Sequence, residues 1–362
     1  MLHGKFGMTN SFWENKKVLI TGHSGFKGGW LAQILFQKDA IVTGISLEPI
    51  SSPNFFYELE INKKTKSYIS DINDYEVLDK IFKKEKPEII FHLAAESLVL
   101  NSYKNPINTF KTNIIGTANV LELSKKYSDF IKSVVIVTTD KCYRNLEKGN
   151  FFVEDDPLGG IDPYSASKAC AEILTDCYLN SYFQKLPTNI ASARAGNVIG
   201  GGDWAFNRLI PDIINSIFDN KELIIRYPNA VRPWQHVLEP IFGYLKLAEN
   251  LFYDQKFCQA WNFGPSEKNN NLSVIQIIEY IENKLNRELK YSIKKEAEHE
   301  AGMLNLNSTK AKEMLNWIPK FCIEEALDLT INWYKNFYVS RQNLESLTLD
   351  QIKLYENLEV LS

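Results

Sequence analysis

Three glycines spaced three residues apart place the strongest constraint on how this chain can fold. Gly22, Gly25 and Gly28 follow the short apolar run Lys17–Thr21 and precede a helical pattern at Trp30–Lys38. Glycine permits a tight strand-to-helix turn and lets the backbone approach a pyrophosphate, which the helix N-terminus attracts. The strand–turn–helix context favours a dinucleotide site over a purely structural turn. We expect cofactor contacts from the whole turn, which comprises Gly22, His23, Ser24, Gly25, Phe26, Lys27 and Gly28.

The rest of the first half alternates apolar runs with helical patterns. Strands are predicted at Ala40–Ser46, Glu88–Ala95 and Ser133–Thr138, and amphipathic helices at Tyr75–Lys84 and Asn108–Lys126. Strands that are apolar throughout and alternate with helices indicate a parallel sheet covered on both faces. The predicted fold class is therefore α/β, a Rossmann-type doubly wound parallel sheet with a smaller C-terminal substrate-binding lobe.

The second half contains more glycine and proline, which is typical of a lobe built from loops and returning segments. We expect the dinucleotide-binding Rossmann domain at 15–195 and the substrate-binding lobe mainly at 196–340, with chain crossovers between them. A C-terminal helix is predicted within 341–362. In open α/β folds such a lobe covers the carboxyl edge of the sheet, where ligands bind.

Composition excludes several classes of function. The 41 Lys and Arg against 44 Asp and Glu give a net charge of −3, so no basic excess indicates nucleic-acid binding. The five cysteines form no CxxC pair, which favours a reducing compartment and argues against a disulfide scaffold. No apolar run approaches the roughly 18 residues of a membrane span, and the first residues lack a signal-peptide pattern. We expect a soluble, cytoplasmic protein without a metal site.

The ends of the next two strands indicate which dinucleotide is bound. Ser46 and Glu48 stand where an acidic residue would hold the adenosine ribose, and no arginine nearby could hold a 2′-phosphate. This favours NAD over NADP. Asp71 and Ile72 follow a further short strand and are predicted to contact adenine, although Asp71 is equally typical of a polar strand end.

A tyrosine and a lysine four residues apart indicate redox chemistry. Tyr164 and Lys168 would share one face of a helix, where the ammonium lowers the pKa of the phenol and favours phenolate. A phenolate beside nicotinamide can take the proton of an alcohol while its carbon loses hydride. The Tyr-x-x-x-Lys spacing is frequent by chance, and it gains weight here from the glycine turn and from the strand that ends at Thr138-Thr139.

These motifs together resemble the extended short-chain dehydrogenase/reductase family of NAD-dependent epimerases and dehydratases, over nearly the whole chain from Lys17 to Pro319. Thr139-Asp140-Lys141 is similar to the active-site triplet of nucleotide-sugar 4,6-dehydratases. Longer stretches resemble the CDP-glucose 4,6-dehydratases in particular: Thr21–Gly28, Asp140–Tyr143, Arg194–Trp204, Arg208–Asp212, Arg232–Pro240 and Trp261–Pro265.

The resemblance implies a hydro-lyase that converts CDP-glucose to CDP-4-keto-6-deoxyglucose with NAD, in deoxysugar biosynthesis for lipopolysaccharide O-antigen. The implied catalytic residues are Thr139, Asp140, Lys141, Tyr164 and Lys168. Further cofactor contacts are expected from Leu93, Ala94 and Ala95, and substrate contacts from Glu96, Ser97, Asn197, Arg208, Leu209, Arg232 and His236. Arg208 and Arg232 are expected to hold the diphosphate, because guanidinium pairs with phosphate oxygens through parallel donors.

One loop departs from the CDP-glucose pattern and leaves alternatives open. The family usually reads Ala-Ala-Gln-Pro-Leu-Val-Arg, whereas this chain has Ala94-Ala-Glu-Ser-Leu-Val-Leu100. A dehydratase acting on a dTDP-, GDP- or UDP-linked sugar is therefore the first alternative. A 4-epimerase is less favoured, because epimerisation has no use for Asp140 and Lys141. A non-catalytic NAD-binding protein is also less favoured.

The resemblance also implies a homodimer. Members of the family usually dimerise through two helices from each subunit, here Asn108–Lys126 and Tyr164–Phe183. The second helix carries apolar residues on more than one side, which permits such an interface.

Overall fold

Seven parallel strands form the central sheet of the computed structural model, which describes residues 12–146, 149, 151–219, 221–265, 272–294, 304–340 and 343–358. Their order is β11-β7-β5-β4-β1-β2-β3. The bounds are β1 Lys17–Thr21, β2 Ile41–Ser46, β3 Lys66–Ile69, β4 Ile89–His92, β5 Ser133–Val137, β7 Asn189–Ala195 and β11 Ala260–Phe263. The strand order changes direction between β1 and β4, which creates the crevice where such sheets bind ligands. The prediction of a doubly wound Rossmann-type sheet is confirmed.

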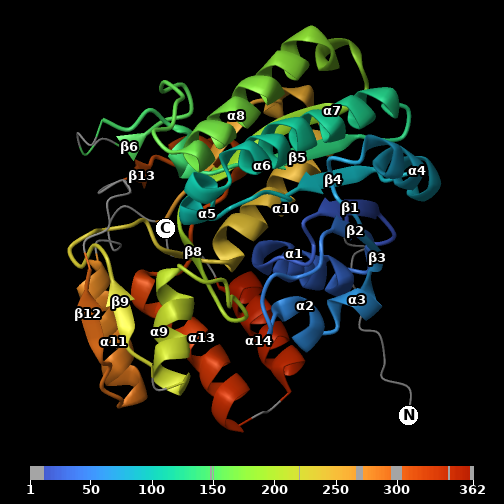
Figure 1. Ribbon diagram of the computed structural model, residues 1–362. Helices are drawn as coiled ribbons and strands as arrows, with labels where there is room; N and C mark the ends of the chain where they lie inside the picture. The colour runs from blue at the N-terminus through green and yellow to red at the C-terminus, as the bar shows by residue number, and fades with distance from the viewer. Residues whose placement is uncertain are drawn as a thin grey trace, which may run out of the picture.

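Helices cover both faces of the sheet because successive strand side chains alternate between two cores. Val18 and Ile20 of β1 pack in one core with Trp30, whereas Leu19 packs in the other with Leu78. Figure 1 shows the two helical layers on either side of the sheet. The helices are α1 Phe26–Gln37 and α10 Leu238–Tyr253 on the first face, and α4 Tyr75–Glu85, α7 Gly116–Lys126 and α8 Pro163–Ser181 on the second.

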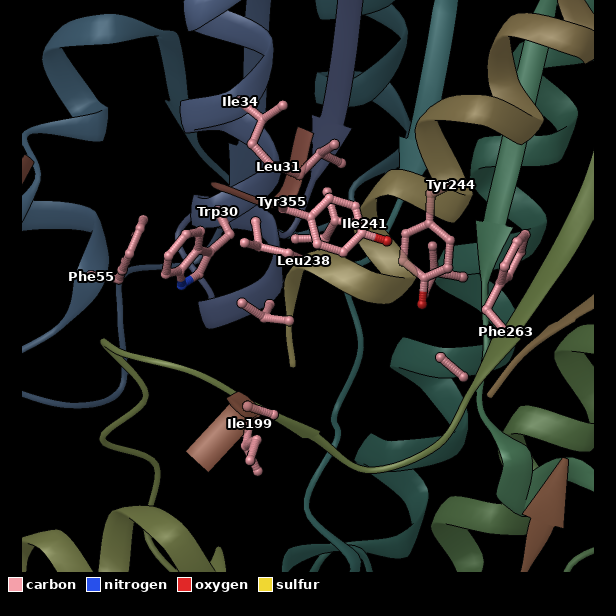
Figure 2. Close-up of a cluster of buried hydrophobic side chains, with 14 of the residues drawn as sticks. Trp30, Leu31, Ile34, Phe55, Ile199, Leu238, Ile241, Tyr244, Phe263 and Tyr355 are labelled. Carbon is pink, nitrogen blue, oxygen red and sulfur yellow. The ribbon is translucent and has the colours of Figure 1, made fainter. Parts of the chain in front are cut away.

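The larger core joins elements that lie far apart in the sequence (Figure 2). Trp30 of α1 stacks on Phe55 with ring centroids 5.1 Å apart, and its indole nitrogen donates to the backbone oxygen of Gly201. Tyr244 of α10 meets Phe263 of β11 edge to face at 5.7 Å. These contacts hold the glycine turn at the start of α1 against the second half of the chain.

The long helix expected at Asn108–Lys126 contains a local irregularity. It consists of α6 Pro106–Phe110, a π-helical turn η1 Lys111–Ile115, and α7. Such a turn inserts one extra residue per turn and rotates the side chains that follow it. Here it directs Asn113 inward, where the side chain is 1% exposed.

The second half of the chain builds the lobe and also returns to the sheet. Helix α10 packs on β5 and β7, and β11 pairs with β7 at one sheet edge. Two segments within the predicted 196–340 lobe, α10 and β11, thus belong to the Rossmann domain. The lobe itself contains β8 Val198–Ile199, α9 Leu209–Asp219, β9 Leu223–Ile225, β10 Gln235–His236, α11 Val274–Leu285, β12 Tyr291–Ile293 and α13 Ile323–Lys335.

Short elements complete the connections. They are α2 Phe55–Glu58, α3 Ile61–Lys64, α5 Val99–Lys104, η2 Asp140–Cys142, β6 Phe151–Phe152, η3 Phe183–Lys185, η4 Gln255–Phe257, β13 Asn305–Leu306, α12 Thr309–Leu315 and η5 Asn336–Ser340. In the part of the chain that the structure describes, no helix is both long and apolar enough to cross a membrane.

The last helix, α14 Leu344–Asn357, is attached to the body through a buried carboxylate. Glu239, at the start of α10, accepts a 2.7 Å hydrogen bond from the Tyr355 hydroxyl and others from the backbone nitrogens of Lys320 and Phe321. Burial raises the pKa of Glu239 to about 7. One side chain thus joins α10, the segment before α13, and α14.

We predict that Tyr355→Phe lowers the free energy of unfolding by about 2 kcal/mol, because a buried carboxylate loses a hydrogen bond while the ring remains packed. The ring would still stack on Phe242, whose centroid lies 4.6 Å away. Urea unfolding of the variant and of Tyr253→Phe, a control at a ring that is 73% exposed, measures the effect. Equal stability of both variants would contradict the role given to Glu239.

Candidate active site

A cavity of about 620 Å³ lies over the carboxyl ends of the central strands and is lined by both halves of the chain. Its lining contains most of the residues predicted to form the site. They are Gly22, Ser24, Gly25, Phe26, Lys27, Gly28, Ser46, Asp71, Ile72, Leu93, Ala94, Ala95, Glu96, Ser97, Thr139, Asp140, Lys141, Tyr164, Lys168, Asn197, Arg208, Leu209 and Arg232. The side chains of His23 and His236 do not line it.

The glycine turn is built for close backbone contact. Gly22 has a φ of +80°, and a Cβ there would lie 2.7 Å from the Ala94 nitrogen. A Cβ on Gly28 would lie 2.1 Å from the Gly22 oxygen, so both positions exclude any side chain. Gly25 differs, because a Cβ there would meet only the Gly22 oxygen at 3.4 Å and would otherwise extend into the cavity.

Gly25 is also the N-cap of α1 and, having no side chain, leaves the first backbone N–H groups of the helix without a side-chain acceptor. These N–H groups and the positive end of the helix dipole suit an anion. The open space at Gly25 and the uncapped helix therefore fit the pyrophosphate of a dinucleotide.

His23 has a structural place beneath the turn. Its Nδ1 lies 3.0 Å from the Ser46 hydroxyl and its Nε2 lies 2.7 Å from the Ser67 hydroxyl. Burial lowers its pKa to about 4, so the ring is neutral. The ring occupies the space where a Cβ on Gly44 would lie. The structure therefore assigns His23 to the support of Ser46 and gives its side chain no access to a cofactor.

The end of β2 offers an acidic surface for a ribose. Ser46, Glu48 and Asp71 line this part of the cavity, and the Tyr57 hydroxyl donates to Glu48 at 2.7 Å. The segment 46–54 contains no lysine or arginine. This surface would repel a 2′-phosphate and accept a 2′-hydroxyl.

Helix α8 presents the tyrosine and the lysine to the centre of the cavity. Asp162 caps this helix by accepting from the Ser165 nitrogen, which places Tyr164 in the first turn. The Lys168 ammonium donates to the Val137 oxygen at 3.1 Å, at the end of β5. Burial lowers the pKa of Lys168 to about 8.

Tyr164 differs from the expectation that Lys168 lowers its pKa. Burial raises the pKa of the phenol, and the hydrogen bond with Thr139 offsets this only in part. The lysine is directed at the Val137 oxygen, and in this structure desolvation has the larger effect on the phenol.

Asp140 and Lys141 lie in a single 3₁₀ turn after β5, with Thr139 as its N-cap. The Lys141 ammonium lies 3.2 Å from Asp140 Oδ1 and 3.0 Å from Asn197 Oδ1, and the Thr139 hydroxyl donates to Asp140 Oδ1 at 2.9 Å. Asp140 is 1% exposed, and its other oxygen, Oδ2, is buried without a partner among the described residues. Both residues line the cavity, where Lys141 presents an ammonium and Asp140 keeps one carboxyl oxygen without a protein partner among the described residues.

Arg208 belongs to the lobe but is held from both sides of the cavity. Its guanidinium pairs with Asp203 at 2.8 Å and donates to the Ser97 hydroxyl at 3.0 Å. Ser97 lies in the loop after β4, within the segment that departs from the CDP-glucose pattern, and Leu100 of that segment, at the start of α5, also lines the cavity. The loop thus orients the arginine expected to bind a diphosphate.

His236 does not reach the cavity. It is fully buried, and its ring meets Trp30 and Phe321 edge to face at 6.0 Å and 5.6 Å. Burial lowers its pKa to about 3. The predicted substrate contact is therefore replaced by a packing role between α1 and the lobe.

Asn113 is a positioning residue that the sequence analysis did not identify. Its amide accepts from the Glu96 nitrogen at 2.9 Å and donates to the Glu96 oxygen at 2.9 Å and the Ser167 hydroxyl at 2.8 Å. Ser167 in turn donates to the Tyr164 oxygen at 2.7 Å. Asn113 thereby joins the loop after β4 to helix α8, and its inward orientation follows from the π-helical turn, which the sequence does not signal.

A buried ion pair behind the site was also not identified from the sequence. Glu172, one turn after Lys168 on α8, lies 2.7 Å from Arg194 of β7 and accepts from the Ser192 hydroxyl at 2.6 Å. Arg194 also donates to the Tyr143 hydroxyl at 2.7 Å. The pair connects helix α8, β7 and the segment that follows Lys141.

The fold, the glycine turn and the Tyr164–Lys168 pair together define a member of the extended short-chain dehydrogenase/reductase class. The family profile described as GDP-mannose 4,6 dehydratase matches residues 19–330, so the chain belongs to this family.

Curated relatives include nucleotide-sugar dehydratases. CDP-glucose 4,6-dehydratase of Salmonella typhimurium strain LT2 is 43% identical over 338 residues, covering 90% of this chain and 92% of the relative. dTDP-glucose 4,6-dehydratase of Haemophilus influenzae is 28% identical and covers 88% of this chain and 97% of the relative.

Solved structures share the architecture. dTDP-glucose 4,6-dehydratase of Bacillus anthracis in complex with NAD has a TM-score of 0.73 at 26% identity, with 89% of this chain and 97% of that chain covered. UDP-glucose 4-epimerase of Thermotoga maritima with UDP-glucose has a TM-score of 0.77 at 25% identity, with 88% and 99% covered.

We predict that Gly25→Ala keeps the stability of the wild-type protein but weakens NAD binding at least tenfold, since the methyl group occupies the approach of the pyrophosphate. Gly28→Ala, by contrast, should fail to fold because its Cβ meets backbone. Thermal unfolding and calorimetric titration of NAD measure the two effects. Wild-type NAD affinity in Gly25→Ala would refute this placement of the cofactor.

Proposed function

We propose that this protein is an NAD-dependent nucleotide-sugar 4,6-dehydratase that converts CDP-glucose to CDP-4-keto-6-deoxyglucose. The observation that carries the proposal is the juxtaposition of Asp140 and Lys141 with Tyr164 in one cavity. The identity of 43% with a CDP-glucose 4,6-dehydratase over 90% of the chain supports the substrate. The acidic surface at Ser46, Glu48 and Asp71 supports NAD over NADP.

The residues of the glycine turn, together with Ser46 and Asp71, would hold the cofactor. NAD held there would supply the acceptor for the C4 hydride and the donor for its return to C6, and its positive charge would favour the phenolate form of Tyr164. All proton transfers belong to side chains of this chain.

Tyr164 takes the proton of the C4 hydroxyl in the oxidation, with Thr139 hydrogen-bonded to the phenol and Lys168 in the next helical turn. The 4-keto group then acidifies the hydrogen on C5. Lys141, in its neutral form, takes that proton, and the electron pair of the C5–H bond forms a double bond between C5 and C6.

Asp140 donates a proton to the C6 hydroxyl, which leaves as water. Asp140 lines the cavity, and we assign that proton to its oxygen Oδ2, which has no protein partner among the described residues. When the hydride returns to C6, Lys141 gives its proton back to C5. Tyr164 then holds one proton and Asp140 lacks one, and transfer through water restores both.

Substrate holding falls to the second half of the chain. Arg208, oriented by Asp203 and Ser97, and Arg232 are proposed to bind the diphosphate, whereas Leu209 and Asn197 border the sugar. Asn197 also accepts from Lys141 and so positions the base. Glu96 and Ser97 are proposed to contact the sugar from the loop after β4.

A panel of nucleotide sugars tests the substrate. CDP-glucose should yield a 4-keto-6-deoxy product, detected by its ultraviolet absorbance in alkali, whereas dTDP-glucose, UDP-glucose and GDP-mannose should be turned over poorly. If another nucleotide sugar of the panel were converted in preference to CDP-glucose, that nucleotide sugar would be the substrate. A product that keeps its C6 hydroxyl would indicate an epimerase.

We predict that Lys141→Met slows product formation by about 10²–10⁴-fold while the oxidation step is retained, because only the base for C5 is lost. Tyr164→Phe should block both steps. Single-turnover absorbance of the reduced cofactor, recorded beside product formation, separates the two variants. Wild-type turnover by Lys141→Met, or loss of its cofactor reduction, would contradict this division of roles.

We also propose a homodimer formed by α8 and the α6–α7 helix of each subunit. These helices lie side by side in Figure 1. They carry exposed apolar side chains. Ile107, Ile115 and Ile173 are 78%, 51% and 57% exposed. A charge at the centre of such a face disfavours association.

Ile173→Glu should therefore convert a dimer to a monomer in sedimentation at micromolar concentration, with unchanged thermal stability of the subunit. Ile224→Glu, at an exposed isoleucine of the lobe, is the matched control. A monomeric wild-type protein would contradict the proposed dimer.

A place in deoxysugar biosynthesis follows from the proposed product. Its use in O-antigen stays a prediction from the resemblance.

A further inference from the structure

Lys27 is a cation of the cavity whose role the mechanism above does not explain. It occupies the second position of α1, directly after Phe26 in the glycine turn, and its side chain lines the cavity. The other cations at the catalytic centre each have a partner: Lys141 has Asp140, Arg208 has Asp203, and Lys168 has the Val137 oxygen. Among the described residues, no carboxylate or carbonyl accepts from the Lys27 ammonium.

The charges that face Lys27 come from three other elements. Arg208, before α9, acts on it most strongly, followed by Lys168 of α8 and then Asp140 and Lys141 of η2. Three of these four groups are cations, and Asp140 is already paired with Lys141. Burial and this repulsion lower the pKa of Lys27 to about 7.

Lys27 lines a cavity that contains two candidate anion sites. Its backbone belongs to the turn that fits a dinucleotide pyrophosphate, and its side chain lines the same cavity as Arg208, which the proposed function assigns to the nucleotide-sugar diphosphate. Two bound diphosphates in neighbouring sites repel each other at short range. An ammonium has three donors and can bond oxygens of both at once.

We propose that the Lys27 ammonium binds the diphosphate of the cofactor and the diphosphate of the nucleotide sugar together, and so couples the binding of the two ligands. The inference rests on the proposed function for the identity of the ligands. It assigns to the glycine turn a contact with substrate in addition to its contact with cofactor.

The coupling has a chemical consequence. Either anion favours the charged form of Lys27. Binding of a ligand above neutral pH is therefore accompanied by uptake of a proton from the solvent. Once the first diphosphate has bound and Lys27 is protonated, the second diphosphate binds to an ammonium that is already charged. Each ligand therefore strengthens the binding of the other.

Calorimetric titrations of the cofactor-free protein test the proposal, with NAD and CDP as probes, each added alone and in the presence of the other. Lys27→Met should weaken both NAD and CDP by roughly 10- to 100-fold, the loss of a charge-assisted hydrogen bond to each, and should abolish the favourable coupling. Lys83→Met, at an exposed lysine of α4, is the matched control and should bind as wild type.

Titrations at about pH 8 in buffers of different ionisation enthalpy count the protons taken up. Wild-type protein should take up most of one proton with the first ligand. Lys27→Arg should bind both ligands without that uptake, because its guanidinium stays charged, and it keeps the test valid if Lys27→Met fails to fold.

Loss of affinity for NAD alone would make Lys27 a cofactor residue and overturn the bridge. Unchanged affinity for both probes would also overturn it, as would unfavourable coupling between NAD and CDP in the wild-type protein. Product formation by wild-type enzyme is measured separately, so failure of the proposed function is distinguishable from failure of this inference.

Discussion

The ion pair between Glu172 and Arg194 is the interaction on which the arrangement of the site depends. It lies between α8 and β7, with both side chains less than 5% exposed, and extends through Tyr143 to Asn262 of β11. Removing one member of a buried pair leaves an uncompensated charge, at a cost of about 3–5 kcal/mol. Helix α8 carries Tyr164 and Lys168, so their placement over β5 follows from this pair.

Much of the fold could be predicted from the sequence because its signals are local. The need for glycine at position 28 arises within the turn, from contact with the Gly22 oxygen, and the uniformly apolar strands indicate a sheet covered on both faces. The four-residue spacing of Tyr164 and Lys168 survives any detail of packing, since a helix places both on one face.

The parts that could not be predicted depend on contacts between distant segments. His23 and His236 look like ligands in a motif, yet packing against Gly44 and Trp30 turns both away from the cavity. Asn113 reaches Glu96 only because of a π-helical turn, which no spacing in the sequence signals. Similarly, the pKa of Tyr164 reflects its burial by both halves of the chain more than its lysine neighbour.

The return of β11 to the sheet bears on how the molecule is synthesised and divided. β7 has β11 as its outer neighbour, and β11 ends at Phe263, more than two hundred residues after β1. Until that segment leaves the ribosome, β7 remains an uncovered edge able to pair with other chains. A truncation after β7 but before β11, between Ala195 and Ala260, should therefore aggregate, and the cofactor-binding half cannot be exchanged between relatives as a contiguous cassette.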